Sequence, residues 1–294
     1  MSNPRDTEPL VSILESFDKF PPQYLRLQDQ QNPQASISGH SVLRQEPPAF
    51  AIKQDHEYWI RLSNEVLNDP NIQKILREEY ISKRDPSTRH FNEADVVASI
   101  MPYLMYPVSR AMWAKYGDEF GRRLEMYHDH VKGDMTFGYG KLDKGIPHAV
   151  LEMKRRGVIR PHEFEDAQRW SLHDSENPNT TERQKQVEIA KILKEAKENG
   201  KTSPFHETTL FEGNALKLVK QASAYAVKYG VQFVGLCDYD YLVLLRFPLL
   251  AKDDRGDYTI GSYCHVTIFD VRETPVRRAL LGFLLVSLKC KIFV

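Results

Sequence analysis

Two acidic residues and one lysine in this chain have the types and the spacing that divalent-metal and phosphoryl chemistry would need. Asp134 is followed eighteen positions later by Glu152, and Lys154 comes two residues after Glu152. The second pair lies in the run Ala149-Val150-Leu151-Glu152-Met153-Lys154, whose apolar residues are typical of a buried strand. Because side chains alternate between the faces of a strand, Glu152 and Lys154 are expected to share one face while their apolar neighbours enter a core on the other. A buried charge is costly unless it is paired or bound to a metal, so these residues form our candidate site for a divalent cation.

The same three residues also have purely structural interpretations. Asp134 follows Gly133, and a Gly-Asp pair is common in turns. Glu152 and Lys154 could instead form an exposed pair on an edge strand. The apolar residues that flank them favour a central strand, because a strand buried on both faces reads as a nearly continuous apolar run.

Helices and strands follow one another in an order that predicts an α/β fold of the mixed α+β type. Apolar spacing, with Gly and Pro at the breaks, defines the elements. The predicted helices are His56 to about Leu67, Glu93–Tyr116 with a kink or break at Pro102 and Pro107, about Thr208–Tyr229, and Pro275–Lys289. The predicted strands are Arg122–His130, Asp134–Tyr139, His148–Lys154, Val231–Cys237, Tyr241–Phe247 and Tyr258–Asp270, with Asp238-Tyr239-Asp240 as a tight hairpin turn. This order predicts a central mixed sheet of five to six strands flanked by helices.

Composition divides the chain into a polar N-terminal segment and one larger domain. Residues 1–50 are rich in Pro and Gln and are predicted to be mostly disordered, with a short helix at Leu10 to Phe20. Residues 51–294 are interpreted as a single domain. Within this domain, residues 157–206 are polar and are interpreted as an insertion or lid that contains a charged helix from about Thr181 to Asn199.

With these elements in place, the chain resembles the PD-(D/E)XK nuclease superfamily, which shares the restriction-endonuclease-like fold. The order helix, three strands, helix, strand carries the resemblance, together with Asp134 and the triplet Glu152-Met153-Lys154. Gln221 and Tyr225 match the Q-x-x-x-Y element found in some nuclease branches of the superfamily. The resemblance covers roughly residues 92–290, and the layout is also similar to that of uncharacterised fungal members. The chain departs from the motif at Gly133, which stands where the motif's name has proline.

The resemblance implies a metal-dependent phosphodiester hydrolase with a restriction-endonuclease-like core. In the superfamily the acids hold Mg²⁺ (or Mn²⁺) and the lysine positions or activates the attacking water, so Asp134, Glu152 and Lys154 are the implied catalytic residues. Mg²⁺ takes oxygen ligands in octahedral geometry, and Asp134 and Glu152 could supply two carboxylate oxygens and Met153 a backbone carbonyl oxygen. A bound ion would polarise a phosphoryl oxygen, and the Lys154 ammonium would stabilise developing negative charge.

Gln221 and Tyr225 are candidates for supporting roles at the same site. The resemblance implies that they orient the lysine or contact the phosphate backbone. They lie four positions apart on one face of a predicted helix, so they could also simply pack there and cap polar groups.

Further acids and two histidines are candidate ligands. An acid from the preceding helix often joins such sites, and Glu93 is the first candidate, with Glu65 and Glu119 behind it. His128 and His130 share a strand face, but no third ligand is spaced near them as a zinc site would require.

A small basic cluster follows the strand that carries Lys154. Arg155 and Arg156 come directly after it, and Lys220 could join them from the following helix. A positive rim would suit the phosphates of a nucleic acid, so these three residues are the predicted nucleic-acid contacts. A solvated loop explains the same charges equally well.

Composition excludes several classes of protein. Lys plus Arg equals Asp plus Glu at 40 each, so the formal net charge is zero, which argues against a strongly basic nucleic-acid-binding domain. The three cysteines are far apart and fit neither a disulfide framework nor a zinc site. The sequence shows no apolar signal core and no run of about eighteen apolar residues, so we expect a soluble protein of the nucleus or cytoplasm, without a membrane partner.

Two functional hypotheses follow. The first is a metal-dependent nuclease that acts on nucleic acid, on DNA rather than RNA. The second is a catalytically inactive module of the same fold that binds nucleic acid or a protein partner, which the zero net charge favours. A nucleotide phosphotransferase and a serine hydrolase are disfavoured, because the sequence has neither a G-x-x-x-x-G-K-[ST] loop nor a G-x-S-x-G elbow.

Overall fold

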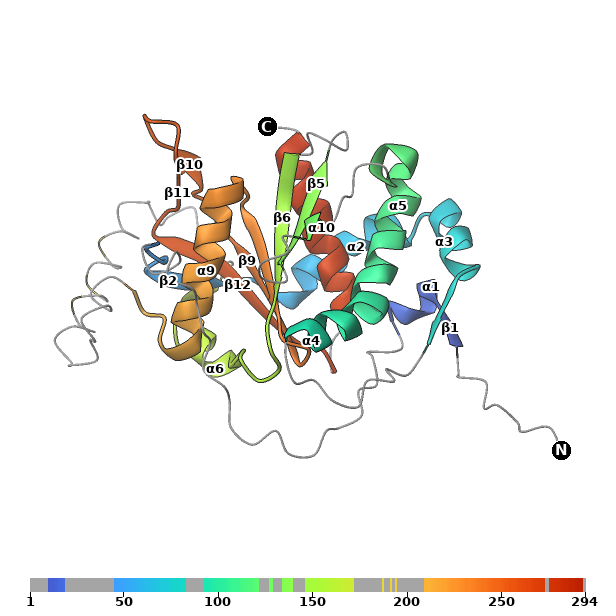
Figure 1. Ribbon diagram of the computed structural model, residues 1–294, viewed down its shortest axis with the longest axis horizontal. Helices are drawn as coiled ribbons and strands as arrows, with labels where there is room; N and C mark the ends of the chain where they lie inside the picture. Colours follow the sequence, from blue (N-terminus) through green and yellow to red (C-terminus); the bar gives the residue numbers. More distant parts are fainter. Residues whose placement is uncertain are drawn as a thin grey trace.

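A mixed β-sheet forms the centre of the molecule (Figure 1). The computed structural model describes residues 10–18, 45–82, 93–121, 127–128, 134–139, 146–171, 187, 191, 194, 209–272 and 275–292. The strand order is β4 (Tyr127–His128), β5 (Asp134–Tyr139), β6 (Ile146–Met153), β8 (Phe233–Cys237), β9 (Tyr241–Arg246), β12 (Tyr263–Asp270), β2 (Phe50–Lys53) and β7 (Gln168–Ser171). Strands β6 and β8, β12 and β2, and β2 and β7 are parallel, and the other neighbours are antiparallel. The predicted mixed α+β class is confirmed: the six strands from β5 to β2 form the body of the sheet, and β4 and β7 are short strands at its edges.

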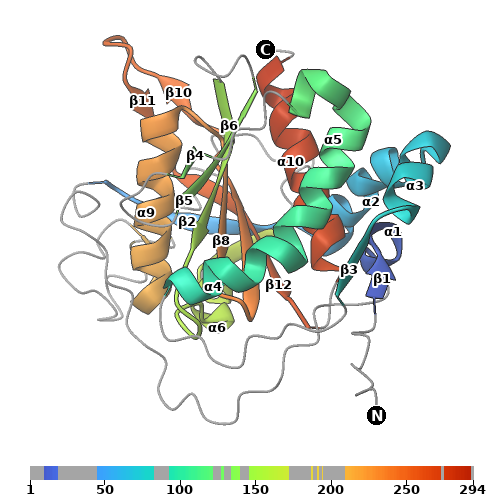
Figure 2. The same ribbon diagram turned by 45° about the vertical axis from the view of Figure 1, so that its right-hand side comes forward.

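Helices cover both faces of this sheet. Helix α9 (Gly213–Tyr229) lies on one face, and α10 (Val276–Ile292), α2 (His56–Leu67) and α5 (Tyr106–Gly121) lie on the other, as Figures 1 and 2 both show. The side chains of β6 divide accordingly. Val150 belongs to the core cluster formed with α9, whereas Leu151 and Met153 belong to the cluster formed with α10, α2 and α5. Strand β6 is therefore a central strand buried on both faces, as its apolar run predicts.

Proline shapes the long helical segment that precedes β4. Helix α4 (Glu93–Ile100) passes into a π-helix, η2 (Met101–Met105), before α5 begins. The predicted interruption at the two prolines is confirmed. Pro107 has no N–H to donate to the carbonyl oxygen of Tyr103, four residues earlier. The buried side chain of Arg277 in α10 donates to that oxygen instead, with Nε 2.6 Å from it.

Helices α10 and α2 approach each other closely at a glycine. A methyl group on Gly282 of α10 would overlap the backbone carbonyl oxygen of Trp59 in α2. We expect Gly282→Ala to lower the free energy of unfolding by at least about 2 kcal/mol, because overpacking outweighs the gain of about 1 kcal/mol in helix propensity. Urea unfolding of the two proteins measures the difference. Equal or greater stability of the variant would contradict the observed helix spacing.

Several short elements were not predicted. They are β1 (Leu10–Ser12), α3 (Pro70–Arg77), β3 (Tyr80–Ser82), α6 (Pro161–Glu165) and β10 (Ala251–Lys252), besides β2 and β7. The strand predicted at Tyr258–Asp270 is divided into β11 (Tyr258–Thr259), which pairs with β10, and β12. The predicted short helix at Leu10 to Phe20 contains α1 (Ile13–Ser16). The helix predicted at Leu10 to Phe20 is wrong in its first turn, because Leu10–Ser12 pairs with β3 as a strand. Ser12 then accepts a hydrogen bond from the Glu15 backbone N–H and caps the short helix α1. The predicted helix at Thr208–Tyr229 begins later, at Gly213, whose φ of 55° lies in the left-handed region.

The segment interpreted as a polar insertion begins later than position 157. Val158, Ile159 and Phe164 are buried in the core beside α9, and β7 forms the sheet edge next to β2. The apolar residues of this stretch are too few and too scattered to show the periodicity of a helix or a strand. Its polar composition therefore predicts a loop. The remainder of the predicted helix at 181–199 lies outside the described residues except for positions 187, 191 and 194, which are helical. Of the strand predicted at Arg122–His130, the structure describes only β4.

Candidate active site at the end of β6

Glu152 and Lys154 lie side by side on the face of β6 that α9 covers. Glu152 is fully buried, and Lys154 is 5 % exposed. The Lys154 Nζ atom contacts Glu152 Oε1 in a buried ion pair. A buried ion pair gains little net stability over apolar side chains of similar size, because both charges lose their hydration. The pair is therefore weak evidence for a stabilising role of these two residues.

Asp134 is the residue opposite Glu152 in the antiparallel ladder of β5 and β6. Residues paired in this way lie directly opposite each other in the backbone ladder. The register thus places two acidic residues opposite each other although they are eighteen positions apart in the chain, and the Asp134 side chain is not among those described.

Helix α9 supplies two polar side chains to the same place. Gln221 Nε2 donates a hydrogen bond of 2.6 Å to Glu152 Oε1 and lies 2.9 Å from the Tyr225 hydroxyl oxygen. Gln221 and Tyr225 are 3 % and 7 % exposed, so the contact is made inside the protein. Gln221 touches the acid of the candidate site, and it reaches that acid through the amide nitrogen.

Two oxygen atoms of this cluster have no hydrogen-bond partner although they are buried. They are Glu152 Oε2 and Gln221 Oε1. Buried polar atoms without partners are rare, because each one has lost its hydrogen bonds to water without replacement. Both atoms are acceptors, so what they lack is a donor or a cation.

The cluster lies where parallel strands end. Strands β6 and β8 are parallel and are joined in the chain by way of α9, and the Lys154 backbone N–H donates to the Cys237 carbonyl oxygen at 2.8 Å. Ligands of open α/β sheets bind outside the carboxyl ends of such strands. The position of Glu152 and Lys154 in the sheet is thus one where a ligand is expected.

The predicted nucleic-acid contacts differ in their surroundings. Arg156 donates two hydrogen bonds to Asp240, of 2.7 Å and 2.9 Å, so its charge is balanced within the protein. Arg155 is half-buried in the turn after β6, and Lys220 is half-buried on α9. The three side chains therefore differ in how much charge they could offer to a phosphate.

One of the other candidate ligands lies on the opposite face of the sheet, and the side chains of the rest are not among those described. Glu65 pairs with Lys115 and Lys289 on the α10 side of the sheet, opposite α9. Glu93 begins α4, which packs next to β6, but its side chain, like those of Glu119 and His128, is not among those described. His130 lies outside the described residues.

Sequence reasoning missed the role of Asp238 beside this site. Asp238 follows β8 directly and is fully buried. Its carboxylate accepts hydrogen bonds from the backbone N–H groups of Ile159 at 2.8 Å and Tyr241 at 3.0 Å. Burial raises the pKa of Asp238 to about 7, and repulsion from Asp240 adds to the effect, while the backbone donors lower it. The signal for it in the sequence is an acid directly after a buried strand, and the same pattern is typical of an ordinary turn residue.

A second missed residue fixes the start of α9. Glu163 Oε2 accepts hydrogen bonds from the backbone N–H groups of Asn214 at 2.6 Å and Ala215 at 2.9 Å, and Arg160 donates to Oε1 at 3.0 Å. The residue before the helix, Glu212, makes no side-chain cap. A carboxylate from a distant helix therefore caps the helix that carries Gln221.

We expect Glu163→Ala to lower the free energy of unfolding by about 1–2 kcal/mol, because two N–H groups at the start of α9 lose their acceptor. Glu165→Ala, an exposed acid on the same short helix, is the matched control and should leave stability within about 0.5 kcal/mol. Chemical denaturation of both variants measures the effect. If the two variants lose the same amount, Glu163 does not cap α9.

Comparison with known proteins identifies no relative of this chain. No family model matches the chain, and neither a curated protein nor a solved structure gives a significant match. Among the side chains that the structure describes, no three His, Cys, Asp or Glu residues gather as a metal site would need. Within the same described residues, no helix is both long and apolar enough to cross a membrane.

Proposed function

We propose that this chain is a divalent-metal-dependent phosphodiester hydrolase that acts on nucleic acid, with DNA as the substrate. The observation that carries the proposal is the buried Oε2 atom of Glu152, which has no partner, at the carboxyl end of β6, with Asp134 opposite and Lys154 alongside. The resemblance to the PD-(D/E)XK nuclease superfamily rests on these same residues and agrees with their placement.

The acceptor atoms without partners fit a divalent cation. Mg²⁺ and Mn²⁺ take oxygen ligands from carboxylates, amides and water. Glu152 and Asp134 would hold the ion, and Gln221 Oε1 is a further buried acceptor next to Glu152. When bound, the ion would polarise a phosphoryl oxygen and lower the pKa of a coordinated water.

The side chains around Glu152 have separate tasks in this proposal. Gln221 holds Glu152 Oε1 from the α9 side, which restricts rotation of the carboxylate and leaves Oε2 for a ligand. Lys154 carries its ammonium next to the same carboxylate, where it would donate to a non-bridging phosphate oxygen and stabilise charge that develops there. Such groups are most effective when they are already in position before the reaction.

A catalytically inactive module that binds nucleic acid or a protein partner is the second candidate. One observation favours it: the Lys154 ammonium is engaged by Glu152, and both side chains are almost completely buried. A site in this state exposes little of its charge to a polymeric substrate. The balanced charge of Arg156 and the zero net charge point the same way.

Incubation of the purified protein with supercoiled plasmid separates the two candidates. A nuclease will nick or linearise the plasmid with Mg²⁺ or Mn²⁺ and not with EDTA, and Lys154→Ala will lose the activity while Glu165→Gln keeps it. An inactive binding module will leave the plasmid intact under all conditions and retard labelled DNA or a partner protein. Cleavage that persists at full rate in Lys154→Ala would refute the nuclease proposal.

A further inference from the structure

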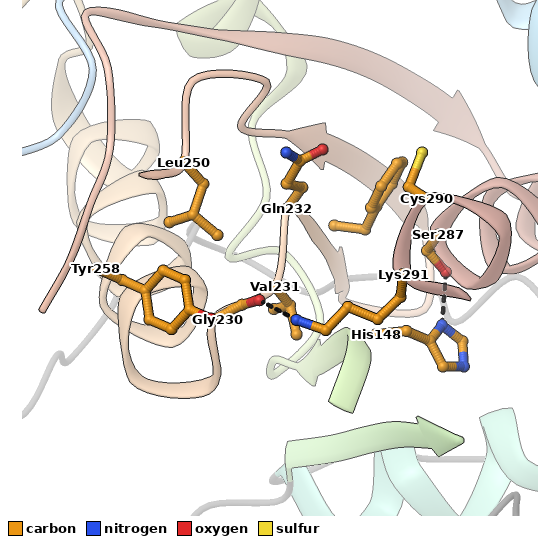
Figure 3. A pocket seen from close by; sticks show the side chains of 10 residues that line it. His148, Gly230, Val231, Gln232, Leu250, Tyr258, Ser287, Cys290 and Lys291 are labelled. Carbon is orange, nitrogen blue, oxygen red and sulfur yellow. Dashed lines mark hydrogen bonds between the residues drawn. The ribbon is translucent and has the colours of Figure 1, made fainter. Parts of the chain in front are cut away.

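A cavity lies at the end of the sheet opposite Glu152, where β6 and β8 begin and where α9 and α10 end (Figure 3). Its volume is about 320 Å³, which is within the range of small-molecule sites. Val231, Phe233, Leu250 and the ring of Tyr258 give it an apolar wall, and Lys291 and His148 are among its polar lining residues. It is separate from the candidate active site, and nothing about it depends on the proposed hydrolase function.

Lys291 brings a cation to this cavity from the last turn of α10. Its Nζ atom donates one hydrogen bond, of 2.9 Å, to the Gly230 carbonyl oxygen, as Figure 3 shows. An ammonium group has three N–H donors. Within the described part of the chain no carboxylate pairs with Lys291, whereas Lys289 on the same turn pairs with Glu65.

A second cation lies next to the cavity wall. Arg246 is the register partner of Phe233, and its guanidinium lies 5.6 Å from the centroid of that ring. The Arg246 Nε atom is buried and has no hydrogen-bond partner. No acid described by the structure forms an ion pair with Arg246, so two cations at this end of the sheet lack a counter-charge.

Two buried histidines lie at this end of the sheet, and both are neutral near pH 7. Burial lowers the pKa of His148 to about 3, and the charge of Lys291 adds to this effect. Burial lowers the pKa of His265 to about 4, and the charge of Arg246 adds there. In both cases a cation acts on the imidazole, and no carboxylate among the described residues opposes it.

The side chain of His148 reaches this place through a bulge in β6. Phe137 pairs with Ala149 and Gly138 with Pro147, so His148 is the extra residue of β6 and has no partner in β5. Bulges re-aim side chains and are frequent near functional sites. His148 Nδ1 lies 2.7 Å from Ser287 Oγ, which also lies 2.8 Å from the Leu284 carbonyl oxygen. The other ring nitrogen, Nε2, is buried and has no hydrogen-bond partner.

We propose that this cavity binds a small organic anion. A carboxylate or phosphate group would be held by the Lys291 ammonium, and an aliphatic or aromatic body would lie against Val231, Leu250 and Tyr258. The cavity supplies the volume and the apolar wall, and the cations without acidic partners supply the charge preference. Lys291 decides affinity for the anionic group, because charge-assisted hydrogen bonds are the stronger ones in a partly buried site.

NMR titration of the full chain with three probes of similar shape tests the proposal. Benzoate and phenyl phosphate carry the anion, and benzyl alcohol is the uncharged counterpart. We expect saturable shifts with at least one anion and none with the alcohol at the same concentration; the stronger of the two anions identifies carboxylate or phosphate as the preferred group. Lys291→Gln should weaken the anion at least about tenfold, while Lys289→Gln should leave its affinity unchanged.

Three results would overturn the proposal of an anion site. Binding of benzyl alcohol as tight as that of the anions would show an apolar cavity without charge preference. Equal weakening by Lys289→Gln would show a general charge effect, and no saturable shift with either anion would show no site at all. Lys291→Arg keeps the charge and should retain binding, which separates loss of the cation from loss of the fold.

Discussion

Replacement of Glu152 by glutamine is expected to lower the rate of metal-dependent plasmid nicking by at least about a thousandfold. The change keeps the size of the side chain and removes the charge that would hold a divalent ion. It also removes the acceptor charge shared by Lys154 and Gln221. Gel assays with Mg²⁺ and Mn²⁺ over several hours measure the residual rate. A variant that nicks at more than about a tenth of the wild-type rate would show that Glu152 does not hold an ion on which the chemistry depends.

The fold of this variant has to be checked, because removing one partner of a buried ion pair costs about 3–5 kcal/mol. The double variant Glu152→Gln, Lys154→Met removes both charges and should recover most of that loss, yet remain inactive. Glu165→Gln changes an exposed acid and should match the wild type in both stability and nicking. Loss of activity in a stable double variant would separate chemistry from folding.

Asp238 is expected to make stability fall as the pH rises. Its pKa is about 7 in the folded protein, compared with about 3.9 in an unfolded chain. Between these values the folded state keeps a proton that the unfolded state has released, so the free energy of unfolding decreases as pH increases through this interval. At about 1.4 kcal/mol for each pH unit, the loss between pH 4 and pH 7 amounts to roughly 4 kcal/mol.

Comparison with Asp238→Asn isolates this effect from other titrating groups. The amide does not titrate, so the stability of wild type relative to this variant should decline by several kcal/mol from about pH 4.5 to about pH 8. Urea unfolding at intervals across this range measures both proteins. Asp253→Asn, an exposed acid in a turn, should run parallel to wild type. A difference between wild type and Asp238→Asn that stays constant with pH would mean that Asp238 keeps its ordinary pKa.

Elements with a clear period or a clear end could be predicted from the sequence. The run around Glu152 identified a central strand, and Gly230, with φ of 61°, ends α9 as expected of a left-handed helix cap. Strands β2 and β7 could not be predicted, because each has only four residues and pairs in parallel with a segment far away in the chain. Their stability comes from these distant pairings, which no local pattern records.

Some residues of the candidate site could likewise be predicted from the sequence, and others could not. Strand alternation was enough to place Glu152 and Lys154 on one face, since that depends only on neighbouring residues. The contacts of Glu163 with α9 and of Asp238 with Ile159 join segments that are 51 and 79 positions apart. In the sequence Glu163 stands in a polar stretch and Asp238 in a predicted turn. The local sequence would be the same if these acids were exposed to solvent. Only the packing of α6 and of the β8–β9 hairpin distinguishes them.

The place of β2 in the sheet has a consequence for how the chain is made. The Thr267 hydroxyl donates to the Gln54 carbonyl oxygen at the end of β2, across 213 positions. Strand β2 leaves the ribosome long before β12 exists, and in the sheet as described β7 is joined through β2. One edge of the nascent sheet therefore has to wait for more than two hundred further residues, a delay during which a chaperone would have an unpaired strand to protect.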